Sequence, residues 1–240
     1  MSRRRFLVIA HRGASAYAPE STRAAFARAV AMGADMIELD VQLTRDDRLV
    51  VFHDARLERT TDGRGLLRRK TFRQLARLDC GRWFAPRYAG QRILLLSEAL
   101  RMIPRRVVVN IELKDTARPT VLLRTLRRVL RLTRAEGRTL VSSFHLALLR
   151  RAARVIPAVP RALLYRSQPR RALSLARRLG CQALHPHWSV ATRPLIRNAH
   201  AAQLRVHVWT VDDPRLATRL LRLGVDGIVA NAPDRLAALR

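Results

Sequence analysis

Short apolar runs alternate with longer amphipathic stretches along nearly the whole chain. The apolar runs predict buried strands at 6–10, 36–41, 107–113, 139–143, 161–165, 183–186, 205–210 and 227–230. Between them, apolar residues recur with helical spacing at 21–32, 97–103, 117–135, 146–155, 169–179, 193–201, 213–222 and 233–239. Eight strands alternating with eight helices predict an α/β fold of the (β/α)8 TIM-barrel type, whose usual length is about 250 residues. A doubly wound open sheet is the alternative, but no glycine-rich phosphate loop follows the first strand.

One segment departs from this alternation. The run at 49–53 predicts an extra strand, and residues 55–92 then form a long insertion after the second strand of the barrel. Its one short helical pattern begins at Thr71, which has capping-box spacing to Gln74. Long insertions on the catalytic face of a barrel are usually functional, so we expect this one to form a wall over a substrate. The alternative is an ordinary surface loop. Because no linker interrupts the pattern, we expect residues 1–240 to form a single domain.

The charge is the unusual feature of the composition. The chain has 240 residues with a formal net charge of +29, and 45 of its 47 basic residues are arginine. One predicted helix carries a cationic stripe formed by Arg124, Arg127, Arg128 and Arg131. A noncatalytic binder of RNA or anionic membrane is therefore an alternative function. However, the arginines are spread over nearly every helix and only 5% of residues are aromatic, so we expect weak electrostatic association and no specific nucleic-acid partner.

Neither the cysteines nor the apolar runs indicate an extracellular or membrane protein. Cys80 and Cys181 lie far apart in sequence without a CxxC motif, which favours two inert thiols over a disulfide or a zinc module. No apolar run approaches the roughly 18 residues of a membrane helix. The start at 2–7 resembles a twin-arginine signal, but the apolar run at 6–10 is shorter than a signal core. We therefore expect a first strand there and a cytoplasmic protein.

Carboxylates recur on one face of two predicted strands. Side chains two residues apart in a strand point the same way, so Glu38 and Asp40 share a face, as do Glu112 and Lys114. Buried carboxylates are strongly penalised unless they are paired or bind a cation. Three of them at the carboxyl ends of neighbouring strands suit a hard divalent cation such as Ca²⁺ or Mg²⁺. The alternative is a salt-bridge network of these acids with Lys114 and Arg12.

Two histidines follow strands beside those acids. His11 comes after the run at 6–10 and His53 after the run at 49–52. Catalytic residues of barrels sit at the carboxyl ends of the strands, so these two are candidates for an acid/base pair. A core or rim role is the alternative, and it is the interpretation we favour for the remaining histidines, His145, His185, His187, His200 and His207.

A set of short motifs then follows in order along the chain. They are His11-Arg12-Gly13, Pro19-Glu20-Ser21-Thr22, Gly33-Ala34-Asp35-Met36-Ile37-Glu38-Leu39-Asp40-Val41, His53-Asp54, Leu57-Glu58-Arg59-Thr60-Thr61, Asn110-Ile111-Glu112-Leu113-Lys114, Ser142-Ser143-Phe144, Trp209-Thr210-Val211 and Gly224-Val225-Asp226-Gly227-Ile228. Together they resemble the signature of the glycerophosphodiester phosphodiesterase family, and the resemblance covers essentially the whole chain. The length is similar to that of the short cytosolic bacterial members.

The resemblance implies a barrel that uses a divalent cation to hydrolyse glycerophosphodiesters to sn-glycerol 3-phosphate and an alcohol. The insertion at 55–92 matches the family's insertion. By this resemblance, the positions that match the family's metal ligands are Glu38, Asp40 and Glu112. Those that match its acid/base pair are His11 and His53, and those that match its substrate contacts are Arg12, Lys114 and Trp209.

Three positions depart from the family pattern. Ser21 stands where the family has Asn, Ala230-Asn231 replaces the usual Thr-Asp, and residues 94–96 are all Leu where Ile-Pro is usual. None of these changes removes a proposed ligand or base, so they bear on substrate preference. A sister phosphodiesterase acting on lysophospholipids or sphingolipids is the nearest alternative. It would differ in the apolar lining of the insertion, where Trp83, Phe84 and Tyr88 suit either pocket.

Overall fold

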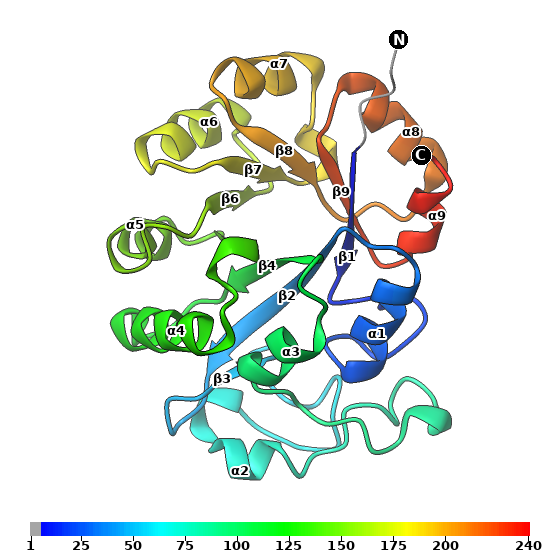
Figure 1. Cartoon of the computed structure of the whole chain (residues 1–240), viewed down its shortest axis with the longest axis vertical. Coiled ribbons are helices and arrows are strands. Elements are labelled where there is room, and N and C mark those ends of the chain that lie inside the picture. Colours follow the sequence, from blue (N-terminus) through cyan, green and yellow to red (C-terminus); the bar gives the residue numbers. More distant parts are fainter. Residues whose placement is uncertain (1–5) are drawn as a thin grey trace.

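A computed structural model describes residues 6–240, so the basic part of the signal-like start, residues 2–5, lies outside the described residues. Eight parallel strands form the centre of the fold (Figure 1): β1 (Leu7–His11), β2 (Met36–Leu43), β4 (Val108–Leu113), β5 (Thr139–Ser143), β6 (Arg161–Tyr165), β7 (Ala183–Pro186), β8 (Arg205–Val208) and β9 (Gly227–Ala230). Each strand pairs with the next, and β1 pairs with both β2 and β9. The sheet is therefore closed, which confirms the TIM barrel and excludes the doubly wound alternative.

Within residues 6–240, eight helices surround this barrel (Figure 1): α1 (Arg23–Ala31), α3 (Leu96–Met102), α4 (Pro119–Thr133), α5 (Leu146–Val155), α6 (Pro169–Arg178), α7 (Arg193–Ala201), α8 (Pro214–Leu223) and α9 (Pro233–Ala237). Proline occupies the first position of α4, α6, α8 and α9, where its missing N–H removes no helical hydrogen bond. The start of each of these helices lies within two residues of the predicted one, whether or not a proline begins it.

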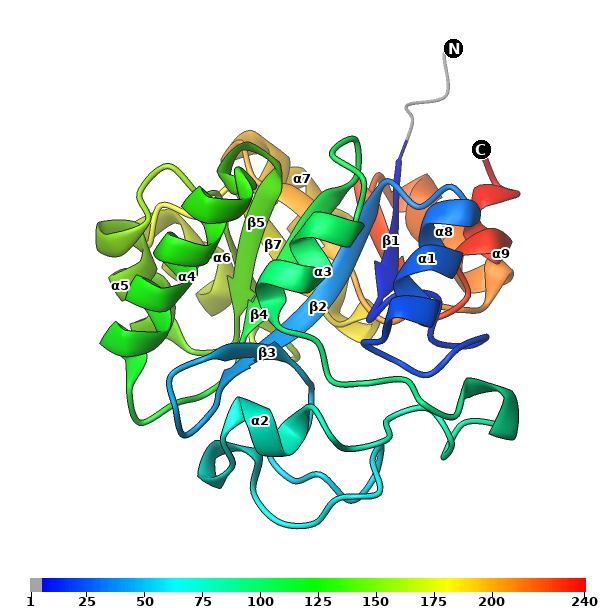
Figure 2. The same ribbon diagram turned by 60° about the horizontal axis from the view of Figure 1, so that its bottom comes forward.

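The insertion lies at the end of the barrel at which the strands finish, on the side of β2 and β3 (Figure 2). It follows β3 (Leu49–Val51), which pairs antiparallel with the end of β2, and it contains α2 (Phe72–Leu75). The predicted capping box is present, because the Gln74 side chain accepts a hydrogen bond from Thr71 N at 2.9 Å while Thr71 caps the helix. Buried side chains of the insertion form a small core with β3 and the adjoining residues, made up of Val50, Phe52, Leu57, Leu67, Leu75, Cys80 and Ile93.

Two predicted strands are shorter in the structure. The strand expected at 49–53 ends at Val51, because the carbonyls of Phe52 and His53 accept hydrogen bonds from the side chain of Gln42 instead of from a strand. The strand expected at 205–210 ends at Val208, where its ladder with β9 finishes. His53 and Trp209 therefore lie on segments that follow strands and not within them.

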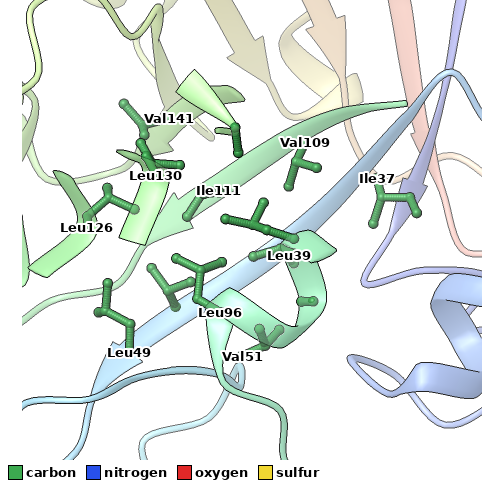
Figure 3. Packing of buried hydrophobic residues seen from close by; sticks show 14 of the residues in the cluster. Ile37, Leu39, Leu49, Val51, Leu96, Val109, Ile111, Leu126, Leu130 and Val141 are labelled. Carbon is green, nitrogen blue, oxygen red and sulfur yellow. The ribbon is translucent and has the colours of Figure 1, made fainter. Parts of the chain in front are cut away.

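Alternation along β2 and β4 determines which side chains face the barrel interior. The outward side chains Ile37, Leu39, Val109 and Ile111 pack in one core with Leu96 of α3, Leu126 of α4 and Val51 of β3 (Figure 3). Since neighbouring residues of a strand point to opposite faces, Glu38, Asp40 and Glu112 are left facing the interior. The helix packing that closes the barrel thus also orients the three carboxylates.

Both cysteines are buried and free, as predicted, and burial raises the pKa of the Cys80 thiol to about 12. No helix within residues 6–240 is long and apolar enough to cross a membrane.

Candidate active site

Three carboxylates meet inside the barrel where β2 and β4 run side by side. In the parallel register of these strands, Asp40 lies next to Glu112. One carboxylate oxygen from each of Glu38, Asp40 and Glu112 lies within 4.8 Å of the others. Glu38 is 6% exposed and Asp40 is 1% exposed. The structure therefore brings together the three acids that the sequence pattern placed on one face.

Two cations lie against the same acids. The Arg12 Nε atom is 3.2 Å from Asp40 Oδ2, and Lys114 Nζ lies 2.9 Å from Asp40 Oδ1 and 2.6 Å from Glu112 Oε1. Burial alone would raise the pKa of Asp40, but Lys114 and Arg12 outweigh it and hold that pKa below its usual value. The salt-bridge network weighed in the sequence analysis is thus present around Asp40.

The two cations do not balance the whole cluster. Burial, together with the charges of Asp40 and Glu112, raises the pKa of Glu38 well above its usual value. Burial and the charge of Asp40 likewise raise the pKa of Glu112 to about 7. Carboxylates that repel one another in a buried site are stabilised by a further positive charge, and oxygen-only donor sets suit hard divalent cations. The side chains that are present therefore fit a divalent metal ion.

A left-handed turn after β1 places Arg12 against the acids. Arg12 and Gly13 have φ values of 56° and 86°, a region that only glycine adopts without strain. A Cβ atom on Gly13 would lie 2.7 Å from the backbone of Ala25, so no other residue fits at this position. The Arg12 N–H donates to the carbonyl oxygen of Glu38 at 2.9 Å and to its carboxylate at 3.2 Å. The His-Arg-Gly motif thus has a backbone requirement in addition to its chemistry.

His11 is the last residue of β1, and its ring is held in one orientation by Asn231. Asn231 donates its amide N–H to Asp212 at 2.6 Å, so its oxygen must be the atom that faces His11 Nδ1 at 2.7 Å. The Nδ1 atom of His11 therefore carries the hydrogen, and Nε2 lies 4.0 Å from Glu38. Burial, followed by the charge of Arg12, lowers the pKa of His11 to about 4.

His53 is held by a carboxylate instead of an amide. Its Nδ1 atom lies 2.5 Å from Asp54 Oδ1. The Gln42 side chain donates to the carbonyl oxygens of Phe52, His53 and Asp54 at 2.8–3.1 Å, which fixes the backbone of this segment. Burial lowers the pKa of His53, and the nearby charge of Asp40 opposes that effect.

A chain of ion pairs connects the insertion to the acids. Arg59 binds Asp54 through Nε at 2.5 Å and Glu20 through two N–H groups at 2.8 Å. Glu20 also accepts from Arg12 at 2.9 Å. The spacing of residues predicts no role for Glu20, Asp54 or Arg59, although all three lie within the motifs that carry the family resemblance. Their position in those motifs was the signal available.

Trp209 lies at the same end of the barrel, directly after β8. Its Nε1 atom donates to the carbonyl oxygen of His185 at 2.7 Å, and its ring packs on the barrel interior beside Ile9. The Phe144 ring meets the Trp209 ring edge-on with centroids 5.6 Å apart, and the Arg166 guanidinium lies 4.6 Å above the Trp209 ring. Trp209 is therefore one wall of the barrel mouth.

In the insertion, Trp83 and Phe84 contact one another, with Trp83 43% exposed.

Comparison with known proteins identifies the family. A model of the glycerophosphoryl diester phosphodiesterase family matches residues 11–235. The glycerophosphodiester phosphodiesterase of Caldanaerobacter subterraneus subsp. tengcongensis is 36% identical over 236 residues, 97% of each chain. That of Bacillus altitudinis is 34% identical over 238 residues, also 97% of each chain.

A solved structure agrees with these relatives. The Oleispira antarctica phosphodiesterase in complex with the product sn-glycerol-3-phosphate has a TM-score of 0.92 and 31% identity, covering 96% of this chain and 94% of that one. Because the family model extends from His11 into the last helix and the relatives cover nearly the whole chain, this chain belongs to the glycerophosphoryl diester phosphodiesterase family.

Proposed function

We propose that this chain hydrolyses glycerophosphodiesters to sn-glycerol 3-phosphate and an alcohol. The observation that carries the proposal is the placement of three buried carboxylates, two cations and two oriented histidines at the carboxyl end of one barrel. Barrel enzymes hold their catalytic groups at that end. The relatives of the same family, one of them bound to sn-glycerol-3-phosphate, support this substrate class.

Glu38, Asp40 and Glu112 would hold one divalent cation, Ca²⁺ or Mg²⁺. Their donors are oxygen only, which suits both ions, and no thiol or imidazole enters the set. When bound, such a cation supplies Lewis-acid stabilisation of the charge that develops on the phosphoryl oxygens. Arg12 and Lys114 would contact the remaining phosphoryl oxygens, because both already lie against Asp40 at the barrel mouth.

His11 and His53 would divide the proton transfers. Each ring is held through Nδ1, by Asn231 or Asp54, so each presents Nε2 to a substrate. An alcohol leaving group needs a proton and a hydroxyl nucleophile must lose one, so two imidazoles are sufficient for both tasks. We leave open which histidine is the base.

The nucleophile we favour is the C2 hydroxyl of the substrate's own glycerol, which would give a cyclic phosphate that water then opens. That hydroxyl is tethered near phosphorus and has an effective molarity that free water lacks. A substrate analogue without the C2 hydroxyl tests this route. Hydrolysis of the analogue at a rate close to that of the natural substrate would show direct attack by water instead.

The experiment that tests the proposed function measures release of sn-glycerol 3-phosphate from glycerophosphoglycerol, with and without chelator. We expect activity that chelation removes and Mg²⁺ or Ca²⁺ restores, and a loss of about 10²–10⁴-fold in His11→Ala or His53→Ala. His200→Ala is the matched control, because His200 lies on the outer helix α7 and pairs with Asp226 at 2.8 Å, at the other end of the barrel from the carboxylates. Full activity in both histidine variants would overturn the assignment.

The arginine-rich surface suggests a side property and not a second function. Weak, salt-sensitive association with RNA or anionic membranes is expected from the charge, without a specific nucleic-acid partner. The cytoplasmic location and the single domain also stay predictions from the sequence.

A further inference from the structure

The mouth of the barrel is covered unevenly. On the side of β2 and β3, the insertion and the ion pairs of Arg59 lie beside His53 (Figure 2). On the other side, only short segments follow the strands. These segments, which we call the open rim, are residues 144–145, 166–168, 187–192 and 209–213 after β5, β6, β7 and β8. A leaving alcohol of variable size needs room, and the open rim is the less covered side of the mouth, so we expect the alcohol to extend over it.

The open rim combines aromatic rings with uncompensated positive charge. Phe144, Trp188 and Trp209 contribute the rings, and Phe144 and Trp188 are 38% and 41% exposed. Aromatic faces alone would favour a quaternary ammonium such as choline. Here, however, the guanidinium of the exposed Arg166 already lies 4.6 Å above the Trp209 ring. Among the described residues, no carboxylate lies within 4.0 Å of Arg166.

Acidic residues do not offset that charge elsewhere on the open rim. The segments after β5, β6 and β7 contain no Asp or Glu. After β8, Asp212 accepts hydrogen bonds from the N–H groups of Asn231 and Ala232, and Asp213 caps α8. Beside the open rim, after β4, the exposed Asp115 lies 3.9 Å from His145. A cationic headgroup above Trp209 would therefore meet Arg166 directly, whereas the exposed carboxylate of Asp115 follows β4, two strands away from β6 in the sheet.

We propose that Arg166 is a specificity-determining residue that selects the leaving alcohol by charge, favouring neutral and anionic alcohols over choline and ethanolamine. The inference rests on the proposed function, since it concerns the alcohol released by that reaction. The repulsion acts across a partly solvated rim, where unit charges a few ångströms apart change a rate constant by about five-fold. Leaving alcohols with an added phosphate would gain by a similar factor.

The test compares kcat/KM for glycerophosphocholine, glycerophosphoglycerol and bis(glycerophospho)glycerol, which carry a cationic, a neutral and an anionic leaving alcohol. The wild type should prefer the last two by about five-fold or more over the first. Arg166→Gln should remove most of this preference, and Arg166→Glu should reverse it, mainly by raising kcat/KM for glycerophosphocholine. Arg197→Gln, which removes the same charge from the exposed outer wall on α7, is the matched control and should leave the ratios unchanged.

The outcomes separate the two claims. If all three substrates are hydrolysed and substitution of Arg166 does not change the ratios of kcat/KM, the specificity role is wrong and the proposed function stands. Equal responses of the ratios to Arg166→Gln and Arg197→Gln would overturn it too, because a long-range field would then explain them. Hydrolysis of none of the substrates, with divalent cation supplied, would refute the proposed function and the specificity role together.

Discussion

Two regions of this barrel use charge in opposite ways. Residues 116–211, which we call the arginine sector, run from the start of α4 through β8 and contain nineteen arginines with a single acid, Glu136. The remaining residues contain the other seventeen acids. In the arginine sector only Arg118, Arg131 and Arg205 lie within 4.0 Å of a carboxylate of a described residue. In the site, Arg12 and Lys114 each contact a buried acid.

The difference shows that net charge and functional charge are separate properties. Exposed arginines are solvated, and screening limits their interactions to roughly 8–10 Å at ordinary ionic strength. Buried charges are screened far less, so their positions determine pKa values and ligand binding. The net charge of +29 therefore reflects mainly exposed arginines, whereas the chemistry of the site depends on the three inward carboxylates.

The largest effect is expected where a buried carboxylate is neutralised. Glu112→Gln and Asp40→Asn should each lower cation-dependent hydrolysis by about 10³-fold or more, because ligand charge largely sets affinity for a hard cation. The folded state should persist, since the barrel is held by the apolar face shown in Figure 3. Thermal unfolding checks that point beside the activity measurement. Full activity of either variant in the presence of chelator would contradict the metal assignment.

The exposed charges should respond to salt instead. Any binding of RNA or anionic vesicles should fall by about 10³-fold between 50 and 200 mM salt if six or more phosphates are contacted. Hydrolysis of a small substrate should change far less over that range. Replacing four arginines of α4 by glutamine should weaken the binding; these are Arg124, Arg127, Arg128 and Arg131. The matched control replaces four arginines of the insertion, which are Arg68, Arg69, Arg73 and Arg77. Equal losses from both sets would remove the distinction between the regions.

The sequence predicts the barrel strands and the carboxylate cluster for one physical reason. Alternation within a strand places Glu38 and Asp40 on one face, and parallel neighbours bring Glu112 to the same depth. Periodicity says nothing about segments that leave the sheet. The strands β3 and β8 therefore end earlier than the pattern predicts. The end of β3 depends on side-chain hydrogen bonds from Gln42, and β8 ends where its hydrogen-bond ladder with β9 finishes.

The residues that hold the histidines were also outside the reach of periodicity. Asn231 lies 220 positions from His11, and Arg59, which binds Asp54, lies 39 positions from its other partner Glu20. Such contacts depend on the closed barrel and on the path of the insertion. A pattern of apolar residues carries no information about either.

A third effect concerns ionisable groups buried within the arginine sector. The imidazoles of His185 and His207, from β7 and β8, lie 3.1 Å apart in the barrel interior. Burial lowers both pKa values, that of His207 to about 4. In the unfolded chain these groups take up protons near pH 6.5, whereas the folded protein resists protonation, so stability should fall as pH drops from about 6.5 to 4. For His207 alone, the free energy of unfolding falls by about 3 kcal/mol over this range.

Denaturant unfolding between pH 7 and 4.5 measures this slope. His207→Asn should flatten it whatever its effect on stability at pH 7, and His145→Asn, at an exposed position, should not. A slope that is the same in all three proteins would show that the carboxylate pairs alone set the acid sensitivity.

The smallest effect is expected at the link between the two regions of the mouth. Asp54 accepts from His53 at 2.5 Å and binds Arg59, so it orients a histidine without contacting the carboxylate cluster. Asp54→Asn should lower kcat by about 10-fold with little change in KM, because the amide can present its N–H to Nδ1 and favour the wrong tautomer. Asp54→Glu should restore part of the activity. Glu58→Gln is the matched control, since Glu58 binds only Arg56 and the backbone of Gly65 within the insertion. A KM effect of the same size in both variants would mean that Asp54 only stabilises the insertion, and the positioning role would be wrong.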